Sequence, residues 1–130
     1  MRRSKNRKYA IDEDIRTTGL ASTDFIQFEC GAQDSTIIQE INSSTDPVVL
    51  FTGNAQDFKR KLDEDHQLVG VSRESIPSNN LDDCILKAVQ FIEKKTGTRK
   101  HRYLHLSTTE GKLVLVGSPS TKNQQIFKIS

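Results

Sequence analysis

The chain has 130 residues, a formal net charge of +2, and 34% hydrophobic and 28% charged residues. This length is typical of one domain, and periodic apolar runs exclude a wholly disordered chain. No uninterrupted apolar run is longer than the four residues of Val48 to Phe51. A secretory signal needs roughly 7–15 and a membrane span roughly 18 or more. We therefore expect a protein of the cytoplasm or nucleus that does not contact a membrane.

Residues 1–23 show no apolar periodicity and begin with a concentration of positive charge. The first ten residues contain five basic side chains: Arg2, Arg3, Lys5, Arg7 and Lys8. This composition predicts a flexible basic arm over residues 1–23, followed by a single domain over residues 24–130. The arm is either a solvated tail, a nuclear-import signal or a contact with phosphate.

Short apolar runs in the first part of the domain predict strands. Residues 25–30 alternate in part, and residues 48–51 form the continuous apolar run of a strand buried on both faces. Residues 66–72, with Leu68, Val69 and Val71, predict a third strand. The spacing of isoleucines over residues 35–41 suits either a helical turn or a strand.

A surface helix is expected between the second and third of these strands. Asn54 resembles a helix cap with Asp57 three residues later. Ala55, Phe58 and Leu62 then form a narrow apolar stripe at helical spacing. These features predict a helix from Asn54 through Asp65.

The segment after Asn80 carries every start and stop signal of a helix. Asn80 is a favoured cap, and aspartates in the first turn and lysines in the last turn complement the helix dipole. Gly97 is placed to end the helix. One continuous apolar face is formed by Leu81, Cys84, Ile85, Ala88, Val89 and Ile92.

Three strands are expected after this helix, at residues 102–107, 112–116 and 124–129, separated by tight turns. The whole pattern predicts an α+β fold, in which two helices pack on a small antiparallel sheet and the C-terminal helix precedes a three-stranded meander. This order of elements is similar to that of roadblock and longin-type adaptor domains. The similarity implies pairing through an edge strand, such as residues 124–129, or through a helix face.

No arrangement of residues predicts an active site, a cofactor site or a metal site. Cys84 lies on the apolar face of the predicted helix, where desolvation raises the pKa of a thiol and makes it unreactive. His101 and His105 lie on or beside a strand, where four residues span about 13 Å. That distance is too long for both to bind one metal ion. We therefore expect a protein that is not an enzyme.

The charge distribution is the strongest functional signal. Residues 1–10 carry +5, residues 11–93 carry −10 and residues 94–130 carry +7. A basic cluster at residues 94–102 contains Lys94, Lys95, Arg99, Lys100 and Arg102. The helix dipole accounts for the two lysines, whereas the loop charges face the acidic middle of the chain, an acidic partner or a nucleic-acid backbone.

These features predict a non-enzymatic protein-binding or scaffold subunit of an intracellular complex. It would interact through an exposed sheet edge and charged surfaces, as a homo- or hetero-oligomer. The alternative is a nucleic-acid-binding accessory domain that uses the basic arm and the 94–102 cluster.

Overall fold

The computed structural model describes residues 7–12, 15, 25–28, 33–118, 122 and 124–129. Within these ranges the α-helices are α1 (Asp34–Asn42) and α2 (Leu81–Lys94). The strands are β1 (Lys8–Ile11), β2 (Ile26–Gln27), β3 (Val48–Thr52), β4 (Gln67–Val71), β5 (Tyr103–Thr109), β6 (Lys112–Gly117) and β7 (Gln125–Lys128). Three short 3₁₀ turns are η2 (Ala55–Asp57), η3 (Ser78–Asn80) and η4 (Thr96–Lys100).

All the strands belong to one mixed sheet in the order β2-β1-β3-β4-β5-β6-β7, so the fold is α+β overall. The strands from β2 to β5 are parallel to their neighbours, whereas β5, β6 and β7 are antiparallel. The prediction of an antiparallel meander at the C-terminus is thus confirmed. The prediction that the whole sheet is antiparallel is wrong, because β2, β1, β3, β4 and β5 pair in parallel.

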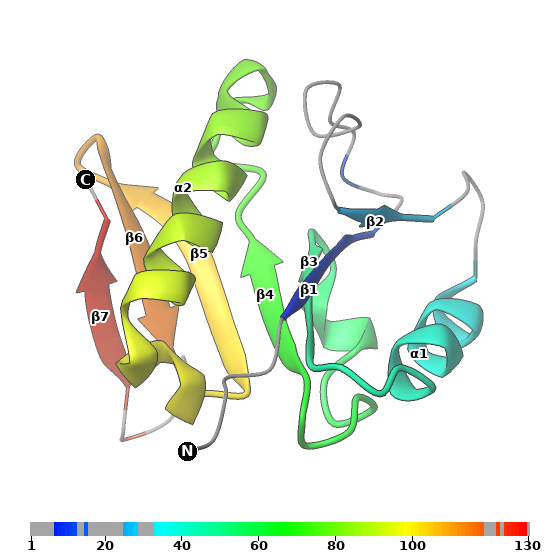
Figure 1. The fold of residues 1–130 in the computed structure, drawn as a ribbon. Helices are drawn as coiled ribbons and strands as arrows, with labels where there is room; N and C mark the ends of the chain where they lie inside the picture. The colour runs from blue at the N-terminus through cyan, green and yellow to red at the C-terminus, as the bar shows by residue number, and fades with distance from the viewer. Residues whose placement is uncertain are drawn as a thin grey trace.

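The apolar sequences of the central strands suit the parallel half of the sheet. Every residue of β3 and β4 is buried, which is typical of parallel strands covered on both faces. The order β2-β1-β3-β4-β5 is that of a doubly wound sheet. From β1 the chain first adds β2 on one side and then adds β3, β4 and β5 on the other side. Figure 1 shows β1 between β2 and β3, with α1 and α2 on different parts of the sheet.

One face of the sheet is covered by α2, and we call it the α2 face. The buried side chains of the helix are Leu81, Ile85, Ala88 and Ile92. They share one core cluster with buried residues of β1, β3, β4, β5 and β6, among them Val49, Val69, Leu104 and Leu115. The predicted helix is therefore confirmed over Leu81–Lys94, with Cys84 and Val89 of its predicted apolar face only partly buried. The predicted caps are wrong, because Asn80 makes no side-chain cap hydrogen bond and the helix ends before Gly97.

The opposite face, which we call the α1 face, is covered over only part of its width. Ile37 and Ile41 of α1 pack there with Ala55, Phe58 and Leu62. Their strand partners are Ala10, Val48, Leu50 and Leu68, from β1, β3 and β4. The residues at 35–41 thus form a helix, one of the two expected alternatives.

The helix predicted from Asn54 through Asp65 is wrong. Only η2 forms, and turns follow it, with Arg60 at a positive φ of 65°. The apolar stripe is nevertheless buried. Asn42 at the end of α1 explains the departure, because its side chain donates to the Lys61 carbonyl at 3.0 Å and accepts from the Asp63 N–H at 2.9 Å. These two hydrogen bonds join backbone groups of the turn to the end of α1.

The N-terminal prediction also needs correction. Lys8–Ile11 form β1 inside the sheet, between β2 and β3, with Ala10 fully buried. A flexible arm over residues 1–23 is therefore wrong for this stretch. Residues 1–6, 13–14 and 16–24 lie outside the described residues. The strand expected at residues 25–30 is shorter in the structure, where β2 has two residues.

Candidate functional site

The carboxyl ends of the parallel strands bring polar side chains together where the strand order reverses. Asp12 follows β1 and Thr52 ends β3, and both are buried. The Thr52 hydroxyl donates to Asp12 Oδ2 at 2.7 Å and accepts from the Asn54 N–H at 3.0 Å. Doubly wound sheets commonly bind ligands at this edge, so these residues form a candidate site.

Two further carboxyl groups lie at the same edge. Asp34 begins α1 and Asp57 ends η2, and their side chains are hydrogen-bonded to each other. Burial raises the pKa of Asp34, and the hydrogen bond and charge of Asp57 and the charge of Asp12 raise it further. Among the described residues, no group of three or more Asp, Glu, His or Cys side chains has the geometry of a metal site.

Sequence reasoning did not single out this edge. Asp12 was assigned to the arm, and nothing local connects it with residues 34, 52 and 57. The available signal was that polar residues follow β1 and β3 directly. That signal becomes informative only when the strands are known to be parallel, because parallel strands end at the same edge.

Cys84, His105 and His101 each lie partly or fully buried within the fold. Cys84 is partly buried against the α2-face core, and desolvation raises the pKa of its thiol. His105 lies on β5, and desolvation lowers the pKa of its imidazole. His101 is 7% exposed and is hydrogen-bonded to Ser118 Oγ at 2.7 Å and Gln125 Oε1 at 3.1 Å.

The side chains of the predicted basic cluster lie in two different places. Lys94, Lys95, Arg99 and Lys100 are exposed at the end of α2 and on η4. Arg102 instead donates from Nη2 to the Leu62 carbonyl at 2.7 Å. It lines a small pocket of about 140 Å³ with residues that include Lys59, Arg60 and Tyr103.

The basic N-terminal residues are described only in part. Lys8 forms an ion pair with Asp46 at 3.4 Å. Arg7 is partly buried and donates from Nη1 to the side chain of Gln67. Arg2, Arg3 and Lys5 lie outside the described residues. The structure thus places Arg7 against the amino end of β4.

A second candidate surface lies on the α1 face over β5, β6 and β7. In the described part of the chain, the core beneath α1 includes Tyr103 of β5 and no residue of β6 or β7. A groove of about 290 Å³ follows beyond it. We call it the β7 groove, and its lining is Ser107, Thr109, Glu110, Lys112, Val114, Val116, Ile126 and Lys128.

Among the described strands β7 is the last in the order, and its outer backbone groups, beside this groove, are paired with no described strand. The Ile129 N–H donates to the Leu113 carbonyl at 2.9 Å, and the register pairs Leu115 with Phe127. Because hydrogen bonding alternates along an antiparallel strand, the N–H and C=O groups of Ile126 and Lys128 point away from β6. The expected exposed edge at residues 124–129 therefore coincides with β7, which is the last strand in the order.

Neither α-helix in the described ranges has the length and apolarity that a membrane crossing requires. Comparison of the chain with protein-family models, with curated proteins and with solved structures finds no match.

Proposed function

We propose that the protein is a non-enzymatic subunit of a protein complex and that it binds its partner through the β7 groove. The observation that carries this proposal is the exposure of Ile126. Its side chain is 58% exposed, the highest value among the large apolar side chains that the structure describes. An exposed apolar residue on a free sheet edge is a ready site for the addition of another strand.

The surface around Ile126 is organised in cross-strand rows. Val116 lies between His105 and Ile126, and Val114 lies between Ser107 and Lys128. The valines supply an apolar floor, and Lys112 and Lys128 supply positive charge beside it. An added strand would gain main-chain hydrogen bonds from β7 and side-chain contacts from this floor.

The partner that fits best is an extended segment in which apolar residues alternate with aspartate or glutamate. Its apolar side chains would meet Val114, Val116 and Ile126, and its carboxylates would meet the two lysines. A second copy of β7 fits less well, because it would bring another Lys128 to the edge. Lysine on an edge strand opposes self-pairing in this way.

The test uses synthetic peptides of about ten residues in which isoleucine alternates with glutamate, and matched peptides with lysine in place of glutamate. Binding is measured by fluorescence anisotropy, and its location by NMR amide exchange. We expect the acidic peptides to bind more tightly and to protect the amides of Ile126 and Lys128. Absence of binding by every acidic peptide would overturn the proposal, and so would protection elsewhere.

A backbone variant separates strand addition from simple apolar contact. Ile126→Pro removes an N–H that points away from β6, and proline is tolerated at such positions on edge strands. We expect it to weaken peptide binding at least tenfold while Ile126→Val retains binding. Equal affinities of these two variants would show that β7 does not receive a strand.

A further inference from the structure

Gln67 joins the two basic segments of the chain through one buried side chain. It is 5% exposed at the start of β4. Its Nε2 donates to the carbonyls of Thr98 at 3.0 Å and His101 at 2.9 Å, and its Oε1 accepts from Arg7. One amide therefore holds the η4 loop on one side and the beginning of β1 on the other.

The loop that Gln67 holds is further restrained by Thr98. This residue is fully buried, and its hydroxyl donates to the Lys95 carbonyl at 2.8 Å. Arg99 and Lys100 come directly after it and are exposed. The buried threonine and the glutamine thus fix the loop backbone from which the two exposed cations project.

Arg7 and Arg99 lie near enough to repel each other. Burial lowers the pKa of the Arg7 guanidinium, and the charge of Arg99 lowers it further. Glu93 is an acidic neighbour of Arg7 and also accepts a hydrogen bond from the Tyr9 hydroxyl. The fold therefore assembles positive charge here, although the two segments are distant in sequence.

Of the acidic middle of the chain, Glu93 is the residue that neighbours this charge in the described structure, beside Arg7. Across the described ranges, no ion pair joins an acidic side chain to Lys94, Lys95, Arg99 or Lys100. The ion pairs that form there are Lys8 with Asp46 and Lys87 with Asp83. Of the three expectations for the loop charges, this arrangement favours the two in which the partner is external, an acidic protein or a nucleic acid.

We propose that one surface for the phosphate backbone of a nucleic acid is formed by Arg7, Lys94, Lys95, Arg99 and Lys100, and that Gln67 is its positioning residue. The surface uses none of the residues that line the β7 groove, so this proposal does not rest on the proposed function.

The composition of the surface favours nucleic acid over an acidic protein. Protein interfaces are centred on apolar or aromatic anchors. The exposed large apolar residues of the described structure are Ile26, Leu86 and Ile126, and none belongs to this surface. Binding through cations alone is insensitive to base sequence and strongly dependent on salt.

The first experiment is a salt titration of the full chain with duplex DNA and with single-stranded RNA, followed by fluorescence anisotropy. On duplex DNA, five phosphate contacts correspond to a slope of about −4.5 in log affinity against log salt. We expect Arg99→Ala combined with Lys100→Ala to reduce the magnitude of this slope by about 2. Both side chains are exposed, so the variant should retain the fold.

The matched control removes the same charge elsewhere. Lys112→Ala combined with Lys128→Ala takes two cations from the β7 groove and should leave the slope unchanged. Equal effects of the two double variants would assign binding to net charge and overturn the proposal. Absence of DNA or RNA binding at about 50 mM salt would also overturn it, because phosphate contacts are strongest at low salt.

The role of Gln67 is tested without changing charge. Gln67→Leu removes the bonds to Arg7, Thr98 and His101 and leaves every cation in place. We expect its affinity for DNA to fall at least fivefold, measured where circular dichroism shows the variant to be folded. Should it fail to fold, Thr98→Val tests the same loop with the same expected direction. Wild-type affinity in a folded variant would exclude a positioning role.

An acidic polypeptide serves as the competing partner. Polyglutamate of the same total charge should displace DNA much less effectively than unlabelled DNA does. Equal displacement would identify an acidic protein as the partner and overturn the assignment to nucleic acid.

Discussion

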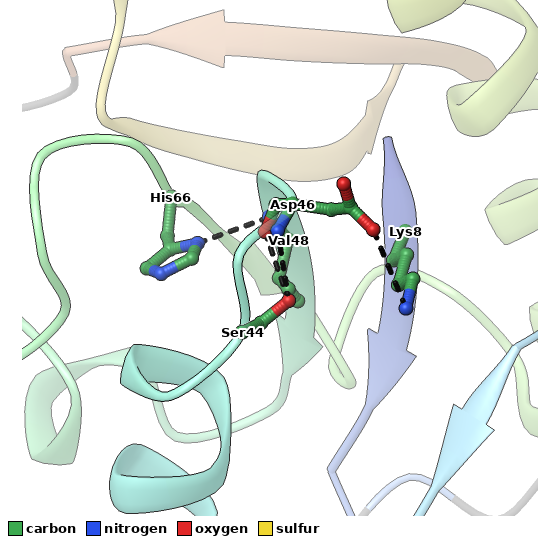
Figure 2. A network of polar contacts seen from close by, with 5 residues as sticks. All are labelled: Lys8, Ser44, Asp46, Val48 and His66. Carbon is green, nitrogen blue, oxygen red and sulfur yellow. Dashed lines mark hydrogen bonds and ion pairs between the residues drawn. The ribbon is translucent and has the colours of Figure 1, made fainter. Parts of the chain in front are cut away.

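The N–H of Val48 donates a hydrogen bond of 3.0 Å to Nδ1 of His66, which links the first residue of β3 to the residue before β4. Figure 2 shows this bond beside a second contact, in which Lys8 reaches Asp46. Ser44 completes the network by donating to the Asp46 carbonyl at 3.0 Å and accepting from the Asp46 N–H at 3.2 Å. The amino ends of three parallel strands are therefore connected by side chains.

His66 makes stability dependent on pH. Its side chain is 4% exposed, and desolvation lowers its pKa below the usual 6.5, although Asp63 and Asp65 oppose the change. A lowered folded pKa gives stability that is present above about pH 6.5 and is lost as the pH falls through the folded pKa. Protonation would also replace the acceptor Nδ1 with a donor. We expect the melting temperature to fall below about pH 6.5.

The measurement compares thermal unfolding of the wild type and His66→Gln over this pH range. The variant keeps an acceptor oxygen and cannot titrate, so its melting temperature should change less with pH. Some dependence will remain, because desolvation also lowers the pKa of His105. Parallel curves for the two proteins would contradict the role assigned to His66.

The Asp34–Asp57 pair predicts the opposite dependence on pH. Burial and Asp57 raise the pKa of Asp34, so its contribution to stability is present below the unfolded pKa and is lost as the pH rises through the folded pKa. Asp34→Asn should therefore stabilise the protein at neutral pH by about 0.5 kcal/mol, the size of a like-charge effect at a surface. Denaturant unfolding near pH 7 and near pH 3.5 tests this, with the gain expected only at the higher pH. A gain of equal size at both values would exclude a charge effect.

Gly117 is required by the packing of His101. A Cβ atom at this position would lie 2.5 Å from Cδ2 and 2.6 Å from Cγ of the imidazole ring. The ring is held by Ser118 and Gln125 and packs edge-on against Phe127. Gly117→Ala should thus destabilise the fold by about 1–3 kcal/mol through overpacking. Gly97→Ala is the control for glycine loss, because a Cβ atom there meets nothing within 4 Å.

Two neighbouring residues of α2 differ in burial and so test which face of the helix packs on the sheet. Ile85 is fully buried, whereas Leu86 is 36% exposed. Ile85→Ala should cost about 2–5 kcal/mol of unfolding free energy, and Leu86→Ala should cost less than about 1 kcal/mol. Urea unfolding of both variants measures the difference. Similar losses would mean that α2 does not pack on the sheet by the face described above.

Local signals were sufficient to predict α2 and the β5–β7 meander. Leu81 to Lys94 contains its own periodicity and dipole-matched charges, and Gly111 lies in the tight turn between β5 and β6. Gly97 does not end the helix as predicted, because Lys95 is the C-cap and Gly97 lies in η4. Helix signals and antiparallel turns operate over a few residues, so they can be recognised without knowledge of the rest of the fold. After Asn54 such local signals predicted a helix that does not form. The structure has a turn there instead, and the side chain of Asn42 is hydrogen-bonded to its backbone.

The sequence by itself therefore determined one amphipathic helix, one meander, the basic composition of residues 94–102 and the position of an exposed edge strand. Only the tertiary structure decided that β1 enters a parallel sheet, that Asp12, Asp34 and Asp57 share one edge, and that Gln67 holds Arg7 and the η4 loop together. The physical reason is that parallel pairing and buried hydrogen bonds join residues far apart in the chain. Such contacts leave no periodic pattern around either partner.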